Sequence, residues 1–118
     1  MSETVRIEVA ALVGSGLCVA SEDGDVVHEA IVPALKAGKR VEISFRDVED
    51  VTSAFLNAAV GQLYGEFSED TIRTGLSVVN MAQEDLQTLK RCVDRAKEYF
   101  KDPDRFHVAA TESLGDDE

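Results

Sequence analysis

The sequence predicts an α/β domain with a mixed sheet of four to five strands and about three helices that lie mainly on one face. Short apolar or alternating segments, typical of strands, alternate along the chain with segments of helical apolar spacing. Strands separated by helices need crossover connections, and these favour a largely parallel sheet. The 118 residues suffice for one domain with a single core.

A β-hairpin is expected near the N-terminus. Residues 5–9 alternate between apolar and charged side chains, and the apolar run 10–13 extends this strand. The segment Gly-Ser-Gly at 14–16 is typical of a turn, and residues 17–20 form a second short strand. Residues 5–20 therefore predict a hairpin.

The first long helix is expected to begin at Ser21, whose hydroxyl can cap it, and to end at Gly38. Pro33 falls inside the helical pattern, so we expect either a kink at this residue or a helix that begins late. One face of the helix carries the apolar residues Val27, Ile31, Ala34 and Leu35.

Residues 41–45 predict the clearest strand, because three apolar residues alternate with Glu42 and Ser44. A charged loop at 46–50 follows this strand. The next helix begins near residue 52, and its apolar stripe consists of Phe55, Leu56, Ala59, Val60, Leu63, Tyr64 and Phe67.

Residues 76–80 predict a strand inside the sheet, followed by a long helix that Pro103 ends. Asn80 is expected to cap this helix, with Gln83 completing a capping box. Residues 106–108 either dock on the sheet or remain loose. The expected core residues are Val41, Ile43, Phe45, Leu76 and Val78 from strands, and Phe55, Leu63, Leu86, Leu89 and Val93 from helices.

The charge of the chain restricts its partners. Twelve basic and 23 acidic residues give a net charge of −11, which repels nucleic acid and anionic membranes but is compatible with a basic protein surface. The charge excess can also serve solubility alone. The N-terminus has no signal-peptide pattern, and no apolar run approaches the ~20 residues of a membrane span, so we expect a cytoplasmic protein.

Signatures of enzymes and metal sites are absent from the sequence. Cys18 and Cys92 form no C-x-x-C motif and are expected to be reduced core thiols. His28 and His107 have no histidine or cysteine at metal-binding spacing. Dinucleotide, P-loop and G-x-S-x-G motifs are also missing. We therefore expect no catalysis, no cofactor and no metal.

Two hydroxyl residues, Thr52 and Ser53, lie at the predicted start of the second helix. Free backbone N–H groups and the positive end of the helix dipole stabilise a phosphate at such a position. The simpler interpretation is that one of the two hydroxyls is only the N-cap of the helix.

The segment at 41–56, VEISFRDVEDVTSAFL, resembles the central block of STAS domains, the fold of anti-sigma-factor antagonists. It is most similar to the STAS-like group DUF4325, in which a hydrophobic strand leads through a short loop into a helix. Residues 38–40 and 78–80 also fit, so the resemblance covers about residues 15–100. These motifs are short and moderately specific.

In STAS domains the strand is followed by Asp-Ser-Ser-Gly, and a kinase phosphorylates the second serine. The resemblance places Thr52 at the aspartate, Ser53 at the first serine, Ala54 at the phosphorylated position and Phe55 at the glycine. Because Ala54 has no hydroxyl, the phosphorylation switch does not carry over to that position. A shift of one residue in the alignment would make Ser53 the acceptor.

The resemblance implies a non-enzymatic regulatory module for signal transduction that binds a switch kinase, a histidine-kinase-type ATPase that acts like an anti-sigma factor. The implied contact residues are Glu49, Asp50, Thr52, Ser53, Ala54 and Asn57. Two other interpretations stay open. One is a structural, self-associating protein of phage or mobile-element type, with a homodimer formed through an open sheet face. The other is a small-ligand or nucleotide-binding module at the same helix start.

Residues 109–118 are small, polar and acidic, so we expect a disordered tail after a STAS-like domain at 1–108. A chain that ends at Val108 should therefore melt within about two degrees of the full chain in a calorimetric scan, because the tail buries little apolar surface. A large drop in melting temperature would show that Leu114 or its neighbours pack against the domain.

Overall fold

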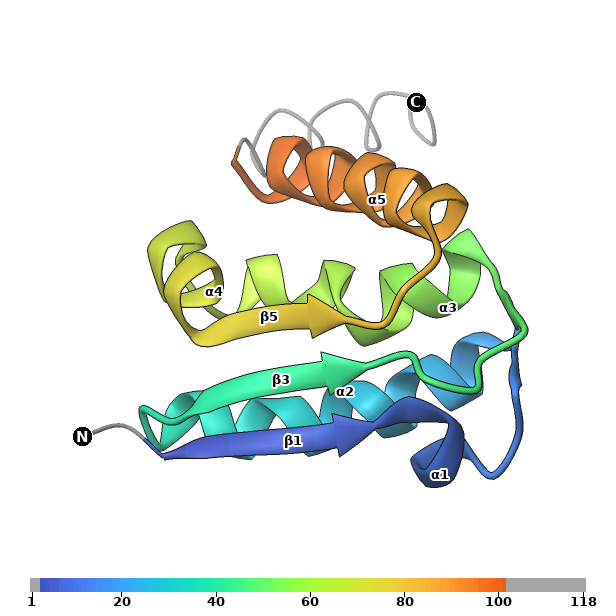
Figure 1. Ribbon diagram of the computed structural model, residues 1–118. Coiled ribbons are helices and arrows are strands. Elements are labelled where there is room, and N and C mark those ends of the chain that lie inside the picture. The colour runs from blue at the N-terminus through green and yellow to red at the C-terminus, as the bar shows by residue number, and fades with distance from the viewer. Residues whose placement is uncertain (1–2, 102–118) are drawn as a thin grey trace, which may run out of the picture.

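Three parallel strands form the centre of the molecule, which a computed structural model describes for residues 3–101 (Figure 1). The middle strand is β3 (Arg40–Ser44). It pairs with β1 (Thr4–Glu8) at one edge and with β5 (Leu76–Val79) at the other. The predicted strands near residues 5, 41 and 76 are thus present.

A second, two-stranded sheet consists of β2 (Leu17–Cys18) and β4 (Asp50–Val51). All pairings in the described part of the chain are parallel, in sheets of three and two strands. The α/β class agrees with the prediction, but the single mixed sheet of four to five strands is wrong. The loop 46–49 turns the chain away from β3, so that β4 pairs with β2 instead of extending the larger sheet.

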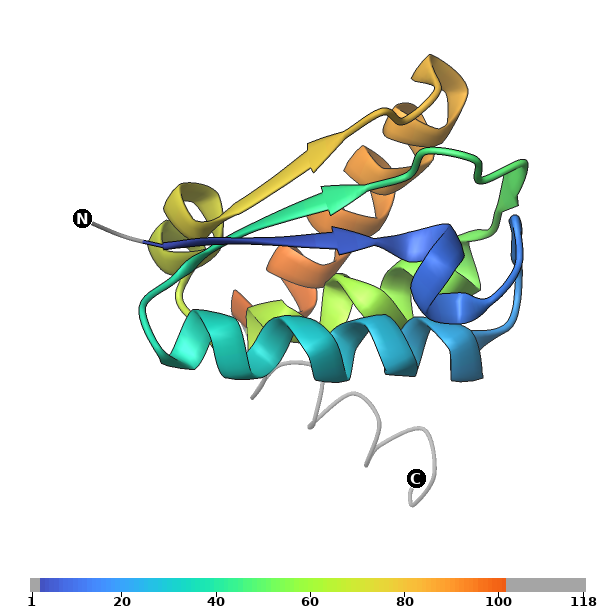
Figure 2. The same ribbon diagram turned by 60° about the horizontal axis from the view of Figure 1, so that its bottom comes forward.

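The helices α2 (Ser21–Lys36), α3 (Ser53–Ala59) and α5 (Gln83–Lys101) lie on the same side of the three-stranded sheet (Figure 2). Two shorter helices flank the strands. α1 (Val9–Val13) follows β1, and α4 (Glu69–Gly75) precedes β5. The described residues thus contain more helices than the three that the sequence predicts.

The core lies between the sheet and these helices, where the apolar face of β3 meets α2 and α3. Val41, Ile43 and Phe45 are buried there, as their alternation with polar residues predicts. α2 and α3 approach each other so closely that a Cβ atom at Gly24 would collide with the backbone carbonyl of Phe55. The largest fully buried apolar side chains are Phe55, Ile31, Ile43, Leu56 and Leu63.

The opposite face of the sheet is polar. Arg6 bonds Glu8 at 2.6 Å and Glu42 at 2.9 Å, and all three side chains are partly exposed. The hydrogen bond from Arg6 holds the pKa of the Glu8 carboxyl below its ordinary value, more than partial burial raises it. This face is therefore suited to contact with water.

The predicted hairpin at 5–20 is wrong. Residues 9–13 form α1, which ends at Gly14 with a positive φ of 85° and a hydrogen bond from its N–H to the Ala10 carbonyl. The Ala-Ala-Leu sequence favours a helical turn once Val9 is buried in the core. β2 then pairs with β4 rather than with β1.

α2 has nearly the predicted extent, and only its N-cap and the effect of its one proline differ from the prediction. The helix begins at Ser21 with Ala20 in the N-cap position, so Ser21 is not the cap and the helix does not begin late. Pro33 lies in the last turn, and the helix continues past it to Lys36. An exposed proline near a helix end removes only one backbone hydrogen bond, which the fold tolerates here.

The predicted second helix is divided. α3 ends at Ala59, and a 3₁₀ helix, η1 (Gly61–Gly65), follows it. Glycine has a low helix propensity, and the tighter 3₁₀ turn still keeps Leu63 buried in line with the stripe of α3. Phe67 is half-buried at the end of the predicted stripe.

β5 is an edge strand and does not lie inside the sheet. Asn80, which follows β5, is not the cap of the last helix, since α5 begins at Gln83. Asn80 instead adopts a left-handed conformation with φ of 59°, and its amide donates a hydrogen bond to the Ser44 hydroxyl at 3.0 Å. Asparagine tolerates this conformation, which lets the chain turn between β5 and α5.

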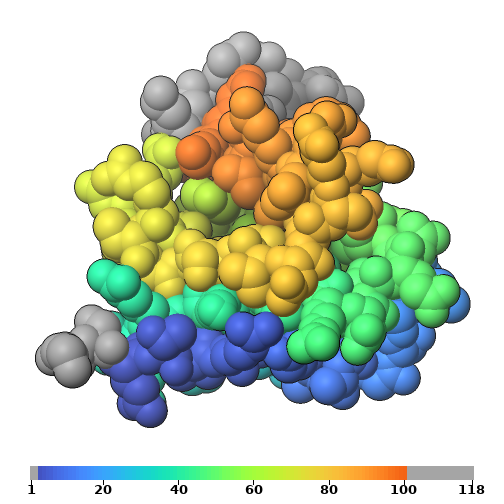
Figure 3. Space-filling model, viewed as in Figure 1, coloured from blue at the N-terminus to red at the C-terminus, as the bar shows by residue number. Residues whose placement is uncertain are grey.

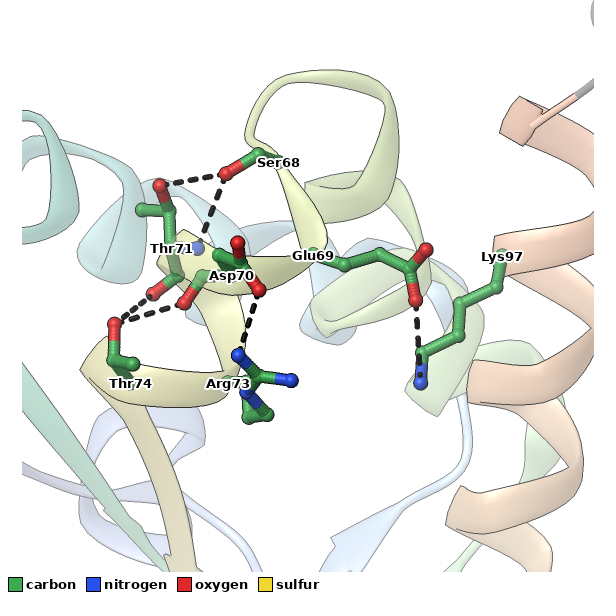
Figure 4. A network of polar contacts seen from close by, with 7 residues as sticks. All are labelled: Ser68, Glu69, Asp70, Thr71, Arg73, Thr74 and Lys97. Carbon is green, nitrogen blue, oxygen red and sulfur yellow. Dashed lines mark hydrogen bonds and ion pairs between the residues drawn. The ribbon is translucent and has the colours of Figure 1, made fainter.

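α5 packs on α3 and η1 through one face that includes Leu89 and Cys92, both buried. Leu86 is 43% exposed, so its predicted place in the core is wrong: it lies in the first turn of α5, one turn before the buried Leu89. An ion pair between Lys97 and Glu69, 3.5 Å apart, connects α5 to α4 (Figure 4). Figure 3 shows the hollow that remains between these two helices.

Pro103, residues 106–108, His107 and the predicted tail at 109–118 lie outside the described residues.

Phe55 offers a direct test of the core. Phe55→Ala should lower the free energy of unfolding by ~3–5 kcal/mol in urea denaturation, because a fully buried aromatic ring would leave a cavity. The matched change Leu86→Ala removes an exposed side chain and should cost less than ~1 kcal/mol. A loss below ~1 kcal/mol for Phe55→Ala would contradict the position of α3 in the core.

Candidate functional site

The residues singled out by the sequence lie at the carboxyl end of the parallel strands, where α/β folds place most of their functional residues. The loop 46–49 leaves β3, passes through β4 and enters α3 (Figure 1). Backbone N–H groups of Glu49 and Asp50 both donate to the carbonyl of Gly16, at 2.8 and 3.2 Å. The site is therefore attached to the segment between α1 and β2.

Thr52 is the N-cap of α3. Its hydroxyl oxygen accepts a hydrogen bond from the Phe55 N–H at 3.2 Å and donates one to the Val19 carbonyl at 2.8 Å. This geometry agrees with the simpler interpretation of Thr52, in which its hydroxyl is the N-cap of the helix. A phosphate on Thr52 would have to break the bond that the hydroxyl donates to Val19.

Ser53 and Ala54 are exposed in the first turn of α3, whereas Asn57 is half-buried one turn later. The backbone carbonyl of Ser53 accepts a weak hydrogen bond from the Cys92 thiol of α5, with a sulfur–oxygen distance of 3.8 Å. The start of α3 is thus fixed on the side of α5 and open on the other side. Of the two hydroxyl residues Thr52 and Ser53, it is Ser53 whose side chain is exposed.

Asn57 belongs to a different part of the surface. It borders a largely apolar cavity between α3, η1 and α5 that also involves Gly61, Ala96 and Phe100. The structure therefore brings Glu49, Asp50, Ser53 and Ala54 to one surface around the start of α3, and Asn57 faces the neighbouring cavity.

Acidic residues from α5 add to this surface. Glu84 and Asp85 lie in the first turn of α5. Burial raises the pKa of the Asp85 carboxyl, and the negative charges of Glu84 and Asp50 raise it further. Asp85 could not be assigned to this surface from the sequence, because it is distant from Asp50 along the chain. The signal in the sequence that could have indicated Asp85 is the pair of acids, Glu84 and Asp85, in the first turn of the helix that follows β5.

Ser44 is a second residue that the sequence did not single out for this site; it is fully buried although it lies on the polar face of β3. Its hydroxyl accepts hydrogen bonds from the Asn80 amide at 3.0 Å and from the Arg46 N–H at 3.3 Å. These bonds hold the ends of β3 and β5 together beside the loop that leads to α3. Ser44 therefore positions the loop and is not itself exposed to a partner.

The two cysteines are free and buried, in agreement with the predicted core thiols. Burial raises the pKa of both Cys18 and Cys92, so the reactive thiolate form is disfavoured. The Nε2 atom of His28 lies 2.7 Å from the Oε2 atom of Glu66. The described residues contain no group of three side chains placed to hold a metal ion.

Residues 23–86 match the family model of a STAS-like domain of unknown function, DUF4325. The chain belongs to this family. The match runs from the first turn of α2 to the first turn of α5, and so includes β3, β4 and the whole surface around the start of α3. No curated protein and no solved structure matches the chain.

The match is shorter than the resemblance at 15–100 but has the same centre. It does not cover β1 and β2, which precede it and complete the two sheets. Among the residues that the structure describes, no helix is both long enough and apolar enough to cross a membrane.

Thr52→Ala should lower the free energy of unfolding by ~1–2 kcal/mol in urea denaturation, because it removes the helix cap and the hydrogen bond to the Val19 carbonyl. Thr52→Ser keeps the hydroxyl and should cost less than half of this amount. An equal loss for both variants would assign the effect to the lost methyl group instead of the hydrogen bonds.

Proposed function

We propose that this STAS-like domain is a non-enzymatic regulatory module that binds a partner protein through the surface around the start of α3. The proposed partner is a histidine-kinase-type ATPase that acts like an anti-sigma factor. The membership of the family and the resemblance of residues 41–56 to the central block of STAS domains support this proposal. By the same analogy, the domain would compete with a third protein for the ATPase.

The main supporting observation is the rigid and open geometry of the α3 start. Thr52 fixes the first turn through two hydrogen bonds, and Ser53 and Ala54 are exposed beside it. A surface that is held in place before binding loses little conformational entropy in the complex. This arrangement favours recognition by a protein over a catalytic function.

The electrostatics of this surface favour a protein partner over a nucleotide. Four acids surround the start of α3: Glu49, Asp50, Glu84 and Asp85. Their field opposes the binding of a phosphate at this helix start. We therefore give the small-ligand interpretation less support than the interpretation as an interaction module.

Self-association through the open face of the large sheet also receives less support. That face carries Arg6, Glu8 and Glu42 in a network of ion pairs that is partly exposed. Covering these charges with a second copy would remove them from water, and this desolvation cost opposes a homodimer through the sheet face.

Ser53 is the residue that we propose as the modifiable hydroxyl of this surface. Its side chain is exposed, whereas the Thr52 hydroxyl is committed to the Val19 carbonyl. A phosphate on Ser53 adds ~1.5 to 2 negative charges within the proposed contact. Burying that charge in the complex without a partner group would weaken binding while the fold stays intact.

Ser53→Glu should weaken binding of the ATPase at least tenfold, about 1.4 kcal/mol, in a titration by calorimetry. Ser53→Ala should bind nearly normally. Ala37→Glu adds the same charge directly after the C-terminal end of α2 and serves as the matched control. Far-UV circular dichroism should be unchanged in all three variants.

The partner is first isolated by purification of the domain from its native cells. Recovery of no ATPase would count heavily against the proposal. Binding of Ser53→Glu as tight as that of the parent would exclude the start of α3 from the contact.

A further inference from the structure

The small sheet has an outer face that nothing in the described chain covers. Leu17 of β2 lies opposite Asp50 of β4, and Cys18 lies opposite Val51. Cys18 and Val51 are buried, so Leu17 and Asp50 point to the other face, toward solvent. Leu17 is 54% exposed, and Val19, two residues further along, is 45% exposed.

Other exposed apolar side chains lie on the elements around this face. Leu12 belongs to α1, and Val26 belongs to the second turn of α2. α1 packs against both α2 and β2. Four of the six large apolar side chains that are exposed in the described residues thus fall within residues 12–26. This concentration is unlike the scattered exposure that needs no explanation.

The surroundings of this apolar face are strongly acidic. The sequence has no lysine or arginine between residues 7 and 35. The loop 46–49 lies directly beside this segment on the molecular surface (Figure 3), joined to it by the hydrogen bonds to Gly16, and carries Arg46 as its one basic residue. Within residues 12–26 and 46–50, the exposed or half-buried acids are Glu22, Asp23, Asp25, Asp47, Glu49 and Asp50.

We propose that the face formed by Leu17, Val19, Leu12 and Val26 is a docking surface for a protein segment with apolar side chains flanked by lysine or arginine. Apolar residues at the centre of a contact and charged residues at its rim are the usual arrangement of protein interfaces. The acidic rim attracts a basic partner and orients it during the encounter. We name this surface the β2 face.

The charges of the β2 face argue against other occupants. A second copy of the chain, related by a two-fold axis, would bring the same acids against each other. Nucleic acid and anionic lipid surfaces are repelled for the same reason. A basic, apolar protein segment is the occupant that both the side chains and the field fit.

The β2 face adjoins the start of α3, because the Thr52 hydroxyl bonds the Val19 carbonyl at 2.8 Å. The proposal does not depend on the ATPase. An added negative charge is expected to act differently in the two complexes, since at Ser53 it would be buried against the ATPase, whereas beside the β2 face it would attract a basic segment. Ser53→Glu should therefore keep its affinity for a ligand of the β2 face.

The test uses three fluorescein-labelled synthetic peptides of equal length, and their binding to the full chain is followed by fluorescence anisotropy. The first alternates leucine with lysine, the second serine with lysine, and the third leucine with glutamate. We expect the Leu-Lys peptide to bind at least tenfold more tightly than either control. Binding of the Ser-Lys peptide as tight as that of the Leu-Lys peptide would overturn the proposal, because it would assign the binding to the acidic field alone.

Variants of the chain then locate the site. Leu17→Ser with Val19→Ser should weaken Leu-Lys binding at least tenfold, and Glu49→Lys with Asp50→Lys should do the same. Leu86→Ser, at a similarly exposed leucine of α5, is the matched control and should bind like the parent. Circular dichroism and melting temperature report whether each variant is folded.

Two further outcomes would overturn the proposal. One is unchanged binding by the folded Leu17→Ser, Val19→Ser variant, and the other is loss of binding by Leu86→Ser, which would place the contact on α5. Chemical shifts of the parent backbone amides, measured with the Leu-Lys peptide, should change most in residues 15–19 and 47–51. Changes confined to other segments would exclude the β2 face even if the affinities behaved as expected.

Discussion

β3 is the element on which the rest of the fold depends, because among the described strands it alone pairs along both edges. Its parallel register with β1 and β5 aligns the apolar side chains of all three strands on the helix side. A slip by one residue would turn charged side chains such as Arg6 and Glu42 toward the core, so the register is strongly specified. The aligned rows are Val5, Val41 and Leu76, and Ile7, Ile43 and Val78.

The hydroxyl of Thr52 connects this framework to the surface that we propose as functional. It caps α3 and donates a hydrogen bond to the Val19 carbonyl directly after β2, so a single side chain links the start of α3 to the end of β2. Ser44 acts in a similar way at the other end of the loop, where it joins Asn80 and Arg46. The loop between β3 and α3 is therefore held at both ends, and a partner meets a surface of defined shape.

The net charge of −11 is distributed unevenly along the chain. The segment from residue 7 to residue 35 has no lysine or arginine, whereas Lys36, Lys39 and Arg40 follow directly where α2 ends and β3 begins. The acids around α3 and the β2 face therefore produce a stronger local field than the net charge alone would suggest. Such a field accelerates the approach of a basic surface and turns it toward this end of the molecule.

The sequence by itself determined the α/β class, the three strands of the large sheet, the extent of α2, the buried face of α3 and the family. These features follow from local periodicity and from the order of the elements. Tertiary structure decided three features: the division of α3 from η1, the helix at 9–13 and the pairing of β2 with β4. A short apolar run such as residues 9–13 fits either a strand or a helix until its neighbours are known. Of the predicted site, a hydroxyl cap at Thr52 or Ser53 follows from local rules, but only the structure shows that Thr52 is the cap and that Ser53 is exposed. Asp85 and Val19 join the site only through folding, which brings distant segments together.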